Sequence, residues 1–338
     1  MHDGTHTRLA ELADAPGLSG VEEILEEIDR SNQEGIGARM QGRSDHAEDM
    51  YRRAVSIALL YRADLKEGGY DARHFMSDFC TNMGDIRRIE GSGESIDEAA
   101  KYFTSAIQLA GDDKRRKAKA FEFRGIMHQQ YTRDYEQAAN DHESALQLYH
   151  DIGDQMKTAR AHCLYAESLT LHMPFAGFGI GLGNCHKAIR IYDEIIQDRE
   201  SENKETGNEK SGKEETENEK SDDALRKLHH DLGDAYHTLG RIFSRKGNPD
   251  NALDFYRQAS FNMHKAGSRA ANAVIGVRMA VEYMNTGSSS MAGDHIALYE
   301  VLRSKDPCPI QPILTQELDP MVDKVKAYAS ERMQKAER

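Results

Sequence analysis

The chain has 338 residues, of which 38% are hydrophobic and 30% charged, and its formal net charge is −13. This acidity disfavours sequence-independent binding to nucleic-acid phosphates. No stretch approaches the roughly 18 apolar residues of a membrane span, and the first nine residues lack a secretory signal. We therefore expect a cytoplasmic protein that contacts neither nucleic acid nor membrane.

The four cysteines are scattered, so no pair has the close spacing of a zinc site. A reduced compartment fits them best. They are Cys80, Cys163, Cys185 and Cys308.

In chain order, residues 1–20 carry a weak pattern and are expected to be poorly ordered, whereas residues 21–28 form a lead-in helix. Residues 21–304 then repeat one pattern, in which two small residues flank a larger, mostly aromatic one at four- and three-residue steps. These steps place the three residues on one helical face. The sets are Ala47, Tyr51 and Ala54; Ala99, Phe103 and Ala106; Ala138, His142 and Ala145; Ala188, Tyr192 and Ile195; Ala252, Tyr256 and Ala259; and Ala292, Ile296 and Tyr299.

A small residue in the preceding helix allows each set to approach closely, which predicts a helical hairpin. The small residues are Gly35, Gly84, Gly125, Ala166, Gly240 and Gly276. In the clearest unit, Gly247 ends the first helix, Asn248 supplies a cap and Pro249 occupies the first helical position of the second.

This unit resembles the tetratricopeptide repeat, in a variety with long helices, and the resemblance covers about residues 30–304. It implies an all-α fold, a right-handed α-α superhelix of about six helical hairpins. Such repeats stack because one hairpin cannot bury its apolar face alone. The resemblance also implies a concave groove, lined by the first helices, that binds a peptide or protein segment.

Two stretches interrupt the pattern before its end. Residues 176–184 alternate glycine with apolar residues and predict a long turn between helices, which could act as a hinge. Residues 199–223 contain no aromatic or branched aliphatic residue, so we expect a disordered acidic insertion, either a solvated linker or a partner-docking segment.

At the end of the chain, the prolines within residues 305–317 predict a linker. Asp319 and Pro320 then open a capping helix over residues 318–338, with an apolar stripe that seals the last hairpin.

The polar positions around each small residue of the first helices are expected to face the groove, and we interpret them as partner-binding residues. Their mixed charges suit a peptide bound through charge-assisted hydrogen bonds. They are Asn32, Arg39, Asp78, Thr81, Asp85, Arg88, Lys119, Glu122, Gln129, Arg160, Glu167, Asp234, His237 and Arg241.

Other chemistries have less support. His230, Asp234 and His237 share a helical face, but one helix rarely closes a metal shell, so a polar groove face is the preferred interpretation. The glycine stretch lacks the Gly-Lys-Ser/Thr ending of a phosphate-binding loop. His142 stands at an aromatic core position and is expected to pack.

We accordingly expect no enzyme activity, no cofactor and no metal. The favoured function is a protein-interaction scaffold or adaptor. The alternative is a regulatory sensor whose superhelix changes shape when a peptide or ligand binds. The partner and the oligomeric state stay open.

Overall fold

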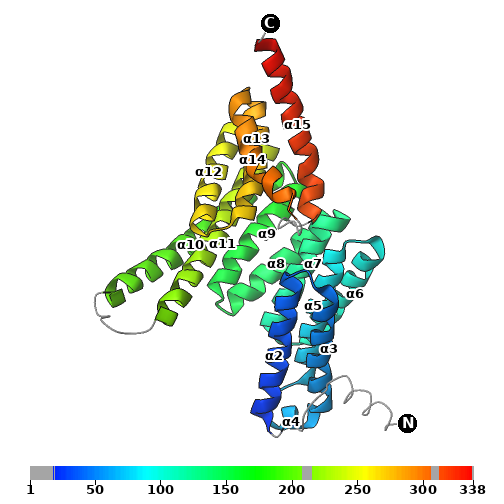
Figure 1. Cartoon of the computed structure of the whole chain (residues 1–338). Coiled ribbons are helices and arrows are strands. Elements are labelled where there is room, and N and C mark those ends of the chain that lie inside the picture. The colour runs from blue at the N-terminus through cyan, green and yellow to red at the C-terminus, as the bar shows by residue number, and fades with distance from the viewer. Residues whose placement is uncertain (1–17, 19, 208–214, 306–311, 337–338) are drawn as a thin grey trace. The chain divides into compact units, whose positions relative to one another are not determined.

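The computed structural model describes residues 18, 20–207, 215–305 and 312–336, and within these ranges the chain forms helices and no strand. It divides into two compact units, Met1–Asp154 and Gln155–Arg338. Figure 1 labels the helices. Their bounds are α2 Val21–Met40, α3 Ser44–Leu60, α4 Arg62–Glu67, α5 Ala72–Glu90, α6 Gly93–Ala110, α7 Lys114–Met127, the π-helical turn η1 His128–Thr132, α8 Tyr135–Asp151, α9 Gln155–His172, α10 Ala176–Gly207, α11 Glu215–Arg245, α12 Pro249–Lys265, α13 Arg269–Asn285, α14 Ser289–Arg303 and α15 Pro312–Ala336.

Each unit stacks three hairpins. In unit 1 the pairs are α2 with α3, α5 with α6, and α7 with α8, and in unit 2 they are α9 with α10, α11 with α12, and α13 with α14. The short α4 lies between the first two pairs, and α15 packs on α13 and α14. Over the described residues, the predicted all-helical fold of six hairpins and a terminal helix is confirmed.

The small residues of the first helices permit close packing within each hairpin. A Cβ added at Gly240 would lie 2.4 Å from the Tyr256 ring, and one at Gly84 would lie 2.7 Å from Phe103. Both rings are fully buried. The small residue of the first helix therefore makes room for the large side chain of the second helix in the same hairpin.

Local signals set most of the turns. Gly247 adopts a left-handed φ of 73°, which ends α11. The Asn248 side chain accepts a hydrogen bond of 3.3 Å from the Asn251 backbone N–H, and Pro249 begins α12, as predicted.

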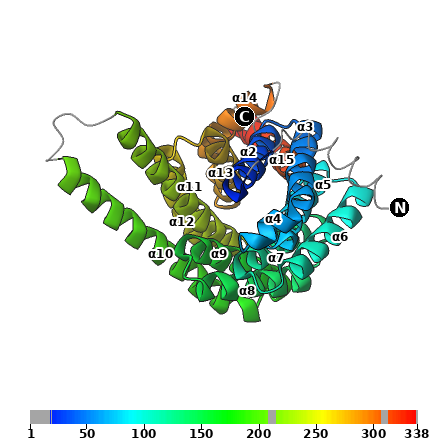
Figure 2. The ribbon, with the colours of Figure 1, turned by 90° about the horizontal axis from the view of Figure 1, so that it is seen from below.

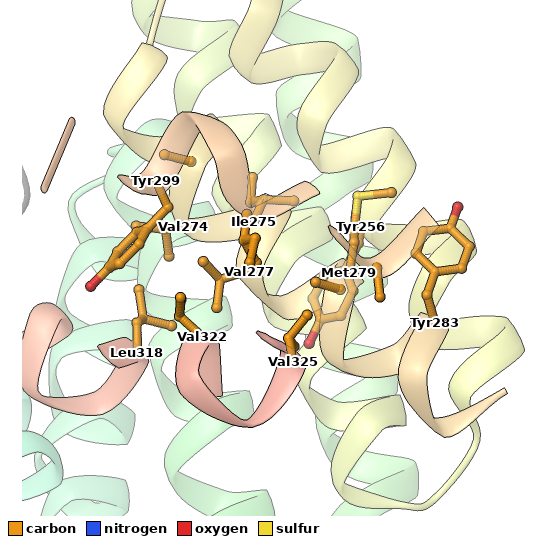
Figure 3. Close-up of a cluster of buried hydrophobic side chains, with 14 of the residues drawn as sticks. Tyr256, Val274, Ile275, Val277, Met279, Tyr283, Tyr299, Leu318, Val322 and Val325 are labelled. Atoms are coloured by element: carbon orange, nitrogen blue, oxygen red, sulfur yellow. The ribbon is translucent and has the colours of Figure 1, made fainter. Parts of the chain in front are cut away.

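Helices α12, α13, α14 and α15 share one cluster of buried hydrophobic side chains, part of which Figure 3 shows. Leu318, Val322 and Val325 of α15 point into it and are almost fully buried. The Tyr299 hydroxyl donates a 2.6 Å hydrogen bond to Asp319, which ties α15 to α14. This helix therefore closes the apolar end of the stack.

The expected start of this capping helix is wrong. It begins at Pro312 rather than at residue 318 and includes Pro320, although proline removes one backbone hydrogen bond. Thr315 and Leu318, on the turn before Pro320, are buried, so packing outweighs that loss. Residues 306–311, the rest of the expected linker, lie outside the described residues.

The glycine stretch expected to be a turn is the first part of helix α10. A Cβ at Gly177 would lie 2.6 Å from the Leu169 carbonyl oxygen, and one at Gly181 would lie 2.6 Å from the Thr170 methyl group. Gly179 and Gly183, two residues further on in each case, face open space. Alternate glycines thus let α10 pack closely on α9, because no side chain separates the two backbones there.

The segment expected to be disordered is helical at both ends. Helix α10 continues to Gly207 and α11 starts at Glu215, while residues 208–214 lie outside the described residues. Glutamate and lysine favour helix even without apolar contacts, which explains the error. Both views in Figures 1 and 2 show the two long helices extending beside each other.

At the other end of the chain, helix α2 runs unbroken from Val21 to Met40. The predicted lead-in helix is therefore the start of the first hairpin. Residues 1–17 and 19, most of the expected disordered terminus, lie outside the described residues. None of the described helices has the length and apolarity needed to cross a membrane.

Candidate functional site

The first helices of the hairpins lie next to one another within each unit. In unit 1, α5 contacts α7 as well as its own partner α6, and in unit 2, α11 contacts α9 as well as α12. We call the surface that they form the first-helix face of each unit. Polar side chains from different hairpins can meet on it, so both faces are candidate sites.

The first-helix face of unit 1 contains an open pocket of about 360 Å³. That volume lies at the lower end of the range for small-ligand pockets. Its lining comes from α2, α5, α7 and the turn before α5. The lining residues are Leu25, Ile28, Asp29, Asn32, Tyr70, Asp71, His74, Phe75, Asp78 and Arg116.

Arg116 is held firmly at one side of the pocket. Its Nε donates a hydrogen bond of 2.9 Å to Asp78, and its Nη1 donates one of 2.5 Å to Asp113. Its guanidinium lies 6.0 Å from the Phe75 ring centroid. Burial alone would lower the pKa of Arg116, but the two carboxylates outweigh it and raise that pKa. The positive charge is therefore already neutralised within the protein.

Asp71 caps helix α5 at the mouth of the pocket. Its Oδ1 accepts a 2.9 Å hydrogen bond from the Arg73 backbone N–H, and its Oδ2 accepts one of 2.6 Å from the Arg73 side chain. These bonds lower the pKa of Asp71 to about 2. The carboxylate is thus ionised at any physiological pH.

Three of the predicted residues form a network further along this face. The buried Asp85 carboxylate pairs with Arg39, and it accepts a 2.6 Å hydrogen bond from Arg88. Arg88 also donates one of 3.1 Å to Gln130. Arg39 is on α2, whereas the other two are on α5, so the network joins the first helices of neighbouring hairpins.

The remaining predicted residues of unit 1 are divided between surface and core. Lys119 is partly exposed, and its Nζ lies 3.4 Å from the Asn82 oxygen. Thr81 is buried and donates to the Ser77 carbonyl oxygen at 3.0 Å. Glu122 is buried and accepts a 2.9 Å hydrogen bond from the Tyr149 hydroxyl.

Gln129, in turn η1, is partly exposed. Asn32 and Asp78 line the pocket, as described above.

The first-helix face of unit 2 carries a second ion-pair network. Glu167 of α9 is buried and lies 2.6 Å from Arg241 and 3.0 Å from Arg245, both on α11. Arg278 of α13 pairs with Glu317 of α15 at 2.8 Å. Burial alone raises the pKa of Glu317, but Arg278 and Arg241 outweigh it and lower that pKa. These ion pairs join α9 to α11 and α13 to α15.

His237 lies within this basic surrounding. Its ring centroid is 5.8 Å from that of Tyr256, and its Nε2 is enclosed without a hydrogen-bond partner among the described residues. Burial, with Arg278 and Arg241 nearby, holds the pKa of His237 well below its usual value. The imidazole is therefore neutral at pH 7.

Asp234 and Arg160 are the exposed members of the predicted set in unit 2. Asp234 lies 3.6 Å from His230, one turn earlier on α11. Among the residues that the structure describes, no group of three or more potential ligands could hold a metal ion.

The placement of the predicted residues corrects part of the sequence interpretation. Four of the fourteen are buried and bond inside the protein, so a partner would meet their neighbours rather than the residues themselves. These four are Thr81, Asp85, Glu122 and Glu167. The other ten are at least partly exposed on the first helices or at their ends.

Some residues of these networks were missed. Arg245 lies one turn after Arg241, so helical spacing alone could have found it. Arg116 likewise lies on a predicted first helix, near its start. Glu317 had no such signal, because it falls in the segment expected to be a linker.

The comparisons agree with this fold. The tetratricopeptide repeat model matches residues 233–260, which span the end of α11 and most of α12. The resemblance seen in the sequence is thereby confirmed for this unit. No curated protein matches the sequence.

Solved structures share the fold at low identity. The apo form of RapI is 11% identical, with a TM-score of 0.53, over 90% of this chain and 99% of that one. BtubC from P. vanneervenii is 12% identical, with a TM-score of 0.50, over 83% of this chain and 93% of that one. At such identities the likeness concerns the fold alone.

Proposed function

We propose that this chain, which carries a tetratricopeptide repeat, is a protein-interaction scaffold that binds a peptide or protein segment on its first-helix faces, without catalysing a reaction. The observation that carries this proposal is the unit 1 pocket. The first helices of all three hairpins contribute to it, and it combines an apolar floor with polar groups at its rim. Apolar area with a few fixed polar groups is the usual composition of a recognition site.

Preorganised charges support the same function. Charged side chains on both faces are held by partners on neighbouring helices, as Glu167 is by Arg241 in unit 2 and Asp78 is by Arg116 in unit 1. Side chains that are already ordered lose less entropy when a partner binds. A partner would therefore meet a fixed pattern of charge.

The sensor alternative loses one of its two supports. It depended on flexibility of residues 177–183 and on the insertion at residues 199–223. The first of these segments is helical and packs on α9.

The proposal can be tested with peptides selected from an unbiased displayed library on the full chain. Selected peptides should lose at least tenfold in affinity when charges of the first-helix faces are reversed, as in Arg160→Glu and Asp234→Lys at exposed positions and Lys119→Glu at a partly exposed one. Matched controls on exposed positions of the second helices are Asp49→Lys and Lys101→Glu. Arg241 is not suitable, because its loss would leave the buried Glu167 without this partner.

If every selected peptide binds the first-helix variants and the wild type equally, or loses affinity only with the two controls, then the site does not lie on the first-helix faces.

A further inference from the structure

The unit 1 pocket has an excess of negative charge. Its lining includes three carboxylates, those of Asp29, Asp71 and Asp78, against one guanidinium, that of Arg116, and one imidazole, that of His74. Asp71 is paired with Arg73. Arg116 is itself shared between Asp78 and Asp113. Phosphates and carboxylates would therefore be repelled, whereas a cation would be attracted.

Beneath this rim lies an apolar floor. Leu25, Ile28 and Phe75 supply aliphatic and aromatic surface, and the exposed ring of Tyr70 adds more at the mouth. A metal ion would gain nothing from such a floor, and no metal-binding cluster occurs in the part of the chain that the structure describes. A cation with an aliphatic stem would use both features, because its methylene groups bury apolar area while its charged end stays at the rim.

Acceptors for such a cation are unused. Asp78 uses Oδ2 for Arg116, and its other oxygen accepts no hydrogen bond from the described residues. Asp29 is exposed and makes no ion pair with them. A positively charged side chain between these two carboxylates would form charge-assisted hydrogen bonds.

Asn32 offers a further group suited to a peptide. It lies on α2 one turn after Ile28, lines the same pocket, and makes no hydrogen bond with the described residues. A primary amide both donates and accepts hydrogen bonds, so it can pair with a peptide main chain. Asn32 therefore supports a side chain that is part of a polypeptide rather than a free amine.

Building on the proposed function, and specifying its partner, we propose that this pocket binds a lysine or arginine side chain of a basic protein segment. The net charge of −13 acts in the same direction, because an acidic protein attracts basic partners over long range. The cationic side chain enters the pocket, its stem contacts Ile28 and Phe75, and its charged end pairs with Asp29 and Asp78.

The test uses the full chain and four short peptides of one sequence, whose central residue is arginine, lysine, norleucine or glutamate. Binding is followed through the methyl resonances of Leu25 and Ile28, assigned by substitution. The arginine and lysine peptides should shift both resonances and bind at least tenfold more tightly than the norleucine peptide. The glutamate peptide should bind most weakly of the four.

The decisive variant is Asp29→Asn, which removes an exposed charge without breaking an internal contact. It should lower the affinity for the arginine and lysine peptides three- to tenfold and leave the affinity for the norleucine peptide unchanged. Asp49→Asn, an exposed carboxylate on α3, is the matched control and should change nothing. The difference in affinity for the arginine and lysine peptides between the two variants should decrease as the salt concentration rises.

The proposal would be overturned if the norleucine peptide bound as tightly as the arginine peptide, or if the Asp29→Asn protein bound the arginine and lysine peptides as tightly as the wild type does. The absence of any shift would also overturn it. If a selected non-cationic peptide then shifts the same methyl groups, the pocket binds peptides and only the ligand class is wrong. If no peptide of any kind binds the first-helix face, the proposed function fails as well.

Discussion

The alternate glycines of α10 give the sharpest test of how the fourth hairpin packs. Gly177 and Gly181 face α9, whereas Gly179 and Gly183 have no atom within 4 Å of an added Cβ. All four lie in the same helix and within seven residues. Four single substitutions to alanine in one helix therefore differ chiefly in the space available for one methyl group, and Gly177, in the first helical turn, gains least from the higher helix propensity of alanine.

The expected magnitudes follow from two opposing effects. Alanine in place of glycine within a helix stabilises by about 1 kcal/mol. At Gly177 the new Cβ would lie 2.6 Å from the Leu169 oxygen, where ordinary contact begins at 3.4 Å, so α10 would have to retreat by the difference of about 0.8 Å. Such overpacking costs about 1–3 kcal/mol. The obstacle is backbone and cannot rotate away, so we take the upper end of that cost, about 3 kcal/mol, and expect a net loss of about 2 kcal/mol after the gain in helix propensity.

The Gly181→Ala variant meets the Thr170 methyl group at 2.6 Å and the Ala166 carbonyl oxygen at 3.2 Å. It should lose about 1 kcal/mol, because its closest contact is a side chain and its backbone contact is longer than at Gly177. Gly179→Ala and Gly183→Ala should gain about 0.5–1 kcal/mol. The assay is urea unfolding followed by circular dichroism, with hydrogen exchange of α9 and α10 to locate the change. If all four variants changed the free energy of unfolding by the same amount and in the same direction, the interpretation of this segment as a packed helix surface would be refuted.

Three further predictions concern Glu167, His237 and Tyr149. Glu167→Gln removes the charge that holds Arg241 and should lower the free energy of unfolding by about 2–3 kcal/mol. The loss is smaller than for a fully buried pair, because the arginines are partly exposed. An unchanged urea midpoint would contradict this prediction. His237 has a lowered folded-state pKa, so its stabilising effect is present above the unfolded pKa of about 6.5 and is lost as pH falls below it, at most about 1.4 kcal/mol per pH unit. His237→Gln should therefore lose less stability than the wild type between pH 7 and 5.5, and equal losses in thermal unfolding would argue against a lowered pKa of His237 in the folded state. Tyr149→Phe removes a hydrogen bond to the buried Glu122 and should cost about 1–3 kcal/mol, measured by urea unfolding, whereas no cost would mean that other groups already satisfy the carboxylate.

The sequence was sufficient for the hairpins because their signals are local. The small and large positions, such as Gly240 and Tyr256, recur at helical spacing, and turn residues such as Gly247 mark the ends. The glycine stretch misled because its partner surface, around Leu169, belongs to another helix. Composition alone cannot distinguish a flexible turn from a helix that packs closely, since both favour glycine.

The candidate site could be located only to the level of a helix face. Spacing placed Asn32 and Asp78 near the pocket, but it could not show that Asp85 and Glu167 are buried while their arginine partners are not. That difference depends on side chains from neighbouring hairpins. Arg116 became important only through its contacts with Asp78 and Asp113, which are non-local.

Site-specific photo-crosslinking tests the central claim most directly. A photoreactive residue placed at Asn32 or Asn82, on the first-helix face, should crosslink a library-selected peptide, whereas the same residue at Asp49 or Lys101, on second helices, should not. Crosslinks confined to Asp49 and Lys101, or spread equally over all four positions, would show that the first-helix face is not where this protein recognises its partner.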